Sequence, residues 1–212
     1  MINSTKKTKS YGLINNMKRE SPFFHPLDEA VFDSRIIQMS GPVDSEMAYY
    51  VNKQLLAMAK ASATKPVYLF IDSPGGEITS GFSIYDTARF IQPEIFTVVT
   101  GLAASMGSLI ALCAKKEHRL AFPNSKFLIH QPLISGTMHG VASDLEIHAK
   151  EILRTKDKIN HIYARETGRP LSEIVEATDR DRWMNAEEAQ KFGLISKIIS
   201  KRTELPGTSA EK

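Results

Sequence analysis

The feature that most constrains the fold is the segment at residues 95–114, which reads IFTVVTGLAASMGSLIALCA. Its first six residues are β-branched or aromatic and predict a strand. Small residues follow and allow the backbone to bend sharply, and the remainder predicts a helix that is apolar on nearly every side. The segment therefore predicts a strand that passes directly into a helix, with the hydroxyl of Ser105 at the junction.

Short β-rich runs alternate with helical stretches along the chain, a pattern typical of an α/β domain. The predicted strands are residues 35–39, 67–71, 95–100 and 126–129. The predicted helices are residues 44–61, 79–91, 106–114, 142–166, 171–177 and 186–192. The longest helix has an apolar stripe and a charged opposite side, so it can cover a core and still project toward a neighbouring subunit.

The length of 212 residues and the hydrophobic content of 42% suit one well-buried core and a single domain. Residues 1–20 are basic and without sustained periodicity, which predicts a mobile arm, and residues 202–212 predict a flexible tail. The domain is expected over residues 21–201. The net charge of +3 is concentrated at the two ends. A nearly neutral body does not suit a nucleic-acid surface, which needs clustered cations on one face.

The single cysteine, Cys113, excludes an intramolecular disulfide, and no Cys/His set has the spacing of a zinc site. The N-terminal region lacks the layout of a secretory signal. The longest apolar stretch, residues 101–114, is too short to span a bilayer. These features predict a cytoplasmic protein, or one in the equivalent interior of an organelle, without a metal and without nucleic-acid or membrane partners.

Two turns carry residues suited to acyl-transfer chemistry. Ser105 lies where a helix begins, so unpaired N–H groups and a positive dipole end would favour an oxyanion beside it. The surrounding small residues resemble a nucleophile elbow, although Ala103 departs from the strict G-x-S-x-G pattern. Close helix packing explains the small residues equally well. Gly75 and Gly76 would let a backbone amide approach a substrate carbonyl, but a plain turn accounts for a Pro-Gly-Gly sequence too.

A base and an acid are also present. His130 ends a predicted strand before Gln131 and Pro132, where its imidazole can project into a cleft at the sheet edge, although a lone histidine is usually a structural hydrogen-bonded group. Asp179 and Asp181 lie in the sequence TDRDRW, which surface ion pairing also explains. Spacing does not decide between the two aspartates.

Five ordered segments resemble the ClpP peptidase family between about residues 35 and 199. They are IDSPGGEITSGFSIYDT, GLAASMGSLI, PNSKFLIHQP, ASDLEIHAKEIL and TDRDRWMNAEEAQKFGLI. The resemblance implies a ClpP/crotonase-like spiral of ββα units in one α/β domain with a long protruding helix. It also implies Ser105 as nucleophile, His130 as base and Asp181 as the third member of the triad. The oxyanion hole would consist of the backbone amides of Gly76 and Met106.

The same resemblance implies an assembly and partners. Two stacked rings of seven subunits would enclose the active sites, joined by the long helix 142–166 and a strand at 135–141. An AAA+ Clp unfoldase would use ATP and deliver unfolded proteins, so this chain itself would need no cofactor. Two further sets of residues are implied: Tyr68, Phe70, Phe90 and Val98 for unfoldase docking, and Asp179 and Arg180 for ring contact. Core packing explains the docking set equally well.

Two other functions are compatible with the sequence. Residues 1–30 follow the axial-loop pattern of the family poorly, which motivates a weakly active or structural subunit in a ring mixed with a paralogue. The second alternative is a crotonase-type acyl-CoA enzyme on the same fold. That chemistry needs no Ser/His/Asp set, so the complete set disfavours it.

Overall fold

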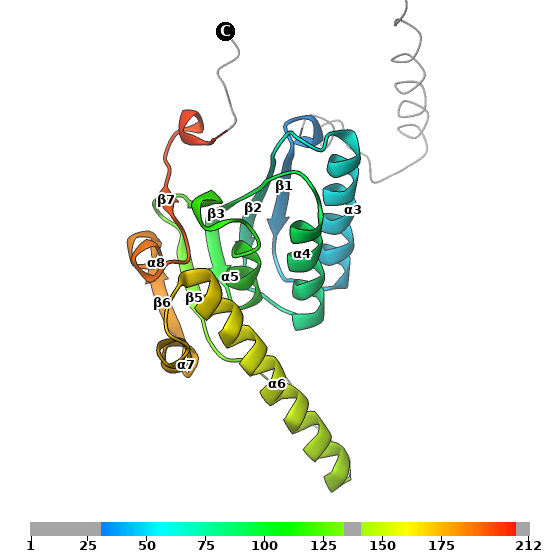
Figure 1. Cartoon of the computed structure of the whole chain (residues 1–212), viewed down its shortest axis with the longest axis vertical. Coiled ribbons are helices and arrows are strands. Elements are labelled where there is room, and N and C mark those ends of the chain that lie inside the picture. Colours follow the sequence, from blue (N-terminus) through cyan, green and yellow to red (C-terminus); the bar gives the residue numbers. More distant parts are fainter. Residues whose placement is uncertain (1–30, 134–140, 207–212) are drawn as a thin grey trace, which may run out of the picture. The chain divides into compact units, whose positions relative to one another are not determined.

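A sheet of mainly parallel strands forms the centre of the fold (Figure 1). The structure is a computed structural model that describes residues 31–133 and 141–206. Residues from Arg35 onward form one compact unit. Within it, parallel strands follow the order β1 (Ile36–Ser40), β2 (Val67–Ser73), β3 (Ile95–Ala104), β4 (Arg119–Ala121) and β7 (Lys197–Ile198). This parallel sheet with its helices confirms the expected α/β fold class.

The long strand β3 changes partner along its length. Its first half pairs with β4, whereas residues 102–104 pair in parallel with β5 (Lys126–Ile129). On its other side β5 pairs antiparallel with β6 (Arg182–Asn185). Because β3 and β5 are parallel neighbours, their carboxyl ends meet at the same edge of the sheet. Ser105 follows one of these ends and His130 follows the other.

Every helix expected from the sequence is present. The helices are α3 (Ser45–Ala61), α4 (Ile78–Phe90), α5 (Met106–Ala111), α6 (Ala142–Thr167), α7 (Leu171–Thr178) and α8 (Ala186–Phe192). The first of these begins where the Asp44 side chain accepts a hydrogen bond from the Met47 amide at 2.8 Å, which satisfies a free N–H at the helix start. All residues of α5 are buried, as its apolar sequence requires.

The helix α6 has two different halves. Its C-terminal part carries buried residues from Ile159 onward, whereas Ile147 and Leu153 in its first half are each 64% exposed. Figure 1 shows this first half extending away from the sheet. Although α6 is long and has exposed apolar residues, no helix among the described residues is both long enough and apolar enough to cross a membrane.

A buried ion pair ties α6 to β4. The Arg119 guanidinium is 1% exposed and donates to the Glu166 carboxylate and to the backbone carbonyls of Ala114 and Glu166. Burial alone would raise the pKa of Glu166, but the charge of Arg119 and the hydrogen bond from Arg165 outweigh it and hold that pKa below its usual value. The carboxylate therefore stays ionised beside Arg119.

Three strands, β4, β6 and β7, were not expected from the sequence. They are two to four residues long, and β6 has the sequence RWMN, in which only Met184 is buried. Such short runs show no alternation that a sequence pattern can detect. They form because a neighbouring strand supplies hydrogen-bond partners.

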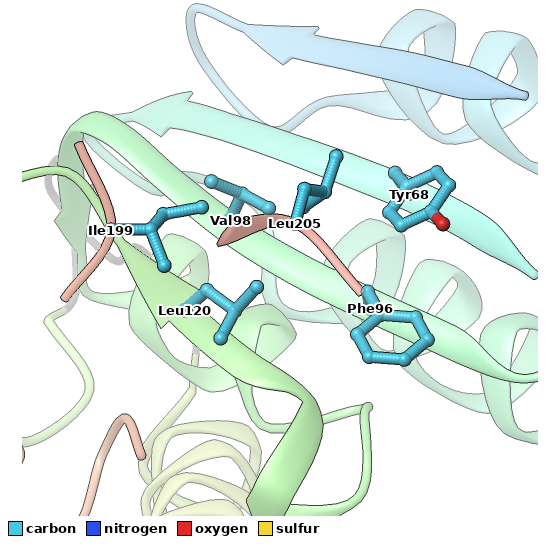
Figure 2. Close-up of a cluster of buried hydrophobic side chains, with 6 residues drawn as sticks. All are labelled: Tyr68, Phe96, Val98, Leu120, Ile199 and Leu205. Carbon is cyan, nitrogen blue, oxygen red and sulfur yellow. The ribbon is translucent and has the colours of Figure 1, made fainter. Parts of the chain in front are cut away.

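An apolar cluster covers one face of the sheet, with helices behind the strands (Figure 2). Its buried members are Tyr68, Phe96, Val98, Leu120, Ile199 and Leu205. The last of these follows the short 3-10 helix η2 (Arg202–Glu204), and the Tyr68 hydroxyl donates to the Pro206 carbonyl. Part of the region expected to be a flexible tail is thus packed on the sheet. The expected arm at 1–20, and residues 135–140 of the expected ring-joining strand, lie outside the described residues.

Candidate active site

Ser105 lies in a tight turn between β3 and α5. Its backbone has φ 52° and ψ −122°, and a positive φ is rare for a residue with a side chain and is often found at functional turns. The Ser105 amide donates to the Leu128 carbonyl of β5 at 2.9 Å. This contact fixes the turn against the neighbouring strand, and the serine side chain remains partly exposed.

The turn at Gly75 and Gly76 packs directly against the Ser105 turn. Both glycines have positive φ, 89° and 151°. A Cβ atom at Gly75 would lie 2.7 Å from the Ser105 Cβ and 2.9 Å from the Met106 nitrogen, so a side chain there would separate the two turns. Within the described part of the chain, the amides of Gly76 and Met106 donate no backbone hydrogen bond. Two free donors therefore lie next to the serine.

The pairing of β5 with β6 brings His130 next to Asp181. In this antiparallel pair Ile129 lies opposite Arg182, so the next residue of one strand faces the preceding residue of the other. The His130 Nδ1 lies 3.3 Å from the Asp181 Oδ1. The imidazole is 11% exposed and the carboxylate 63% exposed. The other aspartate, Asp179, lies instead near Arg180.

The His130 and Asp181 side chains are close but not aligned. No hydrogen bond of good geometry reaches the His130 Nδ1 from the residues that the structure describes, although its distance from Asp181 is that of an ion pair. Hydrogen bonds between catalytic groups are often long or bent before substrate binds. The Asp181 carboxylate is largely exposed, which leaves it room to change its orientation.

Ser105 and His130 line one cleft of about 720 Å³ together with Gly76 and Met106. Apolar side chains make up much of the remaining wall: Ile78, Leu109, Leu128, Leu133 and Ile159. A cleft at the carboxyl ends of parallel strands is the usual ligand site of such sheets. Its size and lining suit a short peptide segment with apolar side chains.

The residues expected to make contacts between proteins lie elsewhere. The Asp179 Oδ2 lies 3.8 Å from the Arg180 Nε, and the two side chains are 60% and 92% exposed. Of the expected docking residues, Tyr68 and Val98 are buried in the apolar cluster beneath Leu205, and Phe70 packs against it, partly buried. Phe90, at the end of α4, is outside this cluster and 80% exposed.

Two polar residues that lie beside Ser105 were not predicted from the sequence. The Ser108 Oγ donates to the Ser105 carbonyl at 2.7 Å and lies 2.6 Å from the Tyr163 Oη. Tyr163 fits the apolar stripe of the long helix, and its contact with Ser108 cannot be seen in the sequence because the two residues are 55 positions apart. The one sequence signal for this arrangement is the position of Ser108, about one helical turn after Ser105, where a serine hydroxyl can donate to the backbone carbonyl of the preceding turn.

Cys113 does not compete with Ser105 as a nucleophile. Its side chain is 5% exposed, and burial raises the pKa of the thiol to about 12. The thiolate is the reactive form of cysteine, and a buried thiol of this kind is inert. Cys113 is therefore not a candidate nucleophile.

Comparison with known proteins identifies the relatives of this chain. The family model described as Clp protease matches residues 23–202. The ATP-dependent Clp protease proteolytic subunit 2 of Treponema denticola is 46% identical over 180 residues, which cover 85% of this chain and 89% of the relative. Subunit 3 of Rhizobium etli is 42% identical, covering 88% and 95%, and subunit 1 of Protochlamydia amoebophila is 44% identical, covering 86% and 88%.

Proposed function

Because the chain belongs to the Clp protease family and is a serine peptidase subunit, we propose that it is an endopeptidase acting on peptides and unfolded proteins. Ser105 is the nucleophile, His130 is the general base and Asp181 orients the imidazole. The observation that supports this triad most is the 3.3 Å approach of His130 to Asp181 at the cleft that Ser105 also lines.

The reaction is an acyl transfer. His130 takes the proton of the Ser105 hydroxyl while the oxygen attacks the peptide carbonyl carbon, and then gives this proton to the departing amine. Water, deprotonated by His130, attacks the resulting ester, and the serine recovers its proton as the acid product leaves. Asp181 accepts a hydrogen bond from the Nδ1 of His130 and keeps the Nε2 free to act as base.

The amides of Gly76 and Met106 stabilise the tetrahedral oxyanion. Both are free donors among the described residues, and the contact between their turns keeps them close to Ser105. Loss of one such donor typically costs about 10²–10³ in kcat. This mechanism uses no metal or organic cofactor, and ATP is used by the partner.

The partner is a Clp ATPase. The relatives are named as proteolytic subunits of ATP-dependent proteases, which implies such an association for the family. We assign the delivery of unfolded protein to an AAA+ unfoldase. A cytoplasmic location fits a chain whose single cysteine is buried and free.

The assembly is two stacked rings of seven subunits. The exposed apolar residues Ile147 and Leu153 of α6 suit burial against an opposing ring. Asp179 and Arg180, which are highly exposed, are available to bind charges across that contact.

The unfoldase docks on the apolar face around Tyr68, Phe70 and Val98, with Phe90 nearby in the assembled ring. Since Leu205 covers Tyr68 and Val98 in the described chain, an incoming apolar loop would have to displace the segment 202–206. Docking of the unfoldase at this surface does not depend on the chemistry at Ser105.

Substitution of Ser105 by alanine tests the proposal. We expect the Ser105→Ala complex to have the mass of the wild-type complex and to hydrolyse no fluorogenic peptide. Peptide hydrolysis by the variant would remove Ser105 from the mechanism. Activity of the wild type that appears only after a paralogue is added would favour the mixed-ring alternative.

A further inference from the structure

Two buried hydroxyl groups link the nucleophile turn to α6. The Tyr163 Oη lies 2.6 Å from the Ser108 Oγ, and the Ser108 Oγ lies 2.7 Å from the Ser105 carbonyl oxygen. Ser108 and Tyr163 are each 1% exposed. The contacts therefore form a continuous chain from a helix that leaves the body of the fold to the backbone of the proposed nucleophile.

The direction of the hydrogen bonds in this chain is determined. A carbonyl oxygen only accepts, so the single Ser108 hydroxyl proton points to Ser105. The oxygen of Ser108 can then only accept from Tyr163, so the tyrosine donates. Burial raises the pKa of Tyr163 far above its usual range, and its hydroxyl keeps its proton under all working conditions.

The carbonyl that receives this chain belongs to a strained residue. Three donors reach the Ser105 carbonyl oxygen: the Ser108 amide at 3.1 Å, the Leu109 amide at 3.2 Å and the Ser108 hydroxyl at 2.7 Å. The side-chain donor is the shortest of the three. It holds the peptide plane after Ser105, which also carries the Met106 amide proposed for the oxyanion hole. A residue at φ 52° keeps that conformation only when its surroundings fix it.

We propose that Tyr163 and Ser108 are positioning residues for the peptidase reaction, acting through the Ser105 carbonyl and coupling the placement of α6 to the geometry of the nucleophile turn. This inference rests on the proposed function of Ser105. Tyr163 also lines the substrate cleft, so its side chain contributes to the cleft wall while its hydroxyl contacts Ser108.

The test measures acylation of Ser105 by a fluorophosphonate in the assembled protein, together with kcat and KM for a fluorogenic peptide. Loss of one hydrogen bond changes a rate by about fivefold. We expect Ser108→Ala to lower the acylation rate and kcat by about fivefold, with KM unchanged. Because the Tyr163 hydroxyl acts through Ser108, Tyr163→Phe should lower the acylation rate and kcat when introduced into the wild type, but should leave both unchanged when introduced into Ser108→Ala.

Thermal stability separates positioning from simple packing. Ser108→Ala leaves the Tyr163 hydroxyl buried without its acceptor, which destabilises the fold, whereas the double variant removes both polar groups and should recover much of the lost Tm. We expect its acylation rate to stay at the level of Ser108→Ala. Recovery of the acylation rate together with Tm would overturn the proposal, as would wild-type acylation in both single variants.

Tyr85 supplies a matched control. It is a buried tyrosine on α4 whose hydroxyl contacts Arg165 and Glu166 of α6, and within the described residues no hydrogen bond connects it to Ser105 or Ser108. Tyr85→Phe should therefore loosen α6 without the fall in acylation, and an equal fall would contradict a specific role for Tyr163. Failure of the underlying function would look different, because Ser105 would then not react with the fluorophosphonate even in the wild type.

Discussion

Replacement of Gly75 by alanine would place a methyl group between the two turns that form the candidate active site. The new Cβ would lie 2.7 Å from both the Ser105 Cβ and the Ala104 carbonyl oxygen, whereas ordinary contacts begin at 3.4 Å. The turns would have to move apart by about 0.7 Å to relieve this contact. A positive φ also costs an alanine about 1–2 kcal/mol.

The movement would separate Ser105 from the amide of Gly76. Since a misplacement of about 1 Å at a reacting group can cost 10²-fold in rate, we expect Gly75→Ala to lower kcat/KM by about 100-fold. The assay is hydrolysis of a fluorogenic peptide, with the mass of the complex measured in parallel so that loss of assembly is not mistaken for loss of chemistry.

Gly41 is the matched control for this variant. Its φ of 99° imposes similar strain on an alanine, but a Cβ there would have no neighbour within 4 Å. Gly41→Ala should therefore share the loss of stability and keep its activity. If Gly75→Ala retains activity within about threefold of Gly41→Ala, the argument from contact between the two turns is wrong.

Three further predictions concern single residues. Asp181→Asn should lower peptide turnover by about 100-fold or more by disturbing the histidine tautomer, whereas Asp179→Asn should change turnover per assembled particle by less than about threefold. Glu166→Gln should lower the free energy of unfolding at pH 7 by about 3–5 kcal/mol, because the buried Arg119 guanidinium loses its negatively charged partner. The pKa of Glu166 is lowered in the folded state, so the ionised carboxylate stabilises the fold fully above its ordinary pKa of 4.5, and this stabilisation is lost as the pH falls below that value. Urea titrations should therefore show that the difference in unfolding free energy between the wild type and Glu166→Gln becomes smaller in acid. Leu205→Ala should make the C-terminal segment more susceptible to trypsin, because it removes about 2–3 kcal/mol of stabilisation from a buried side chain. Val175→Ala, at a 42% exposed position, should not have this effect. Equal cleavage of the two variants would argue against packing of this segment.

The sequence was sufficient to predict most of the elements that carry local periodicity. The predicted helix at 44–61 matches α3, and the strand at 126–129 matches β5. These segments have strong apolar patterns that tertiary packing only reinforces. The turn at Ser105 was also predictable, because small residues follow a β-branched strand and precede an apolar helix.

The residues that depend on long-range pairing could not be found in this way. The register of β5 with β6 brings Asp181 close to His130, and β6 has no sequence pattern of its own from which this register could be predicted. The contact between Ser108 and Tyr163 likewise needs the position of α6 against α5. Leu205 lies in a segment whose polar composition predicts a tail, and it packs because an apolar sheet face is available beneath it.

The most direct test of the central claim is the site of covalent modification. The assembled protein is treated with a fluorophosphonate, digested and mapped by mass spectrometry. We predict one adduct, on Ser105, that forms in step with the loss of peptidase activity and requires His130. An adduct on another residue that accounts for the inactivation, or complete inactivation with Ser105 unmodified, would contradict the assignment of Ser105 as the nucleophile.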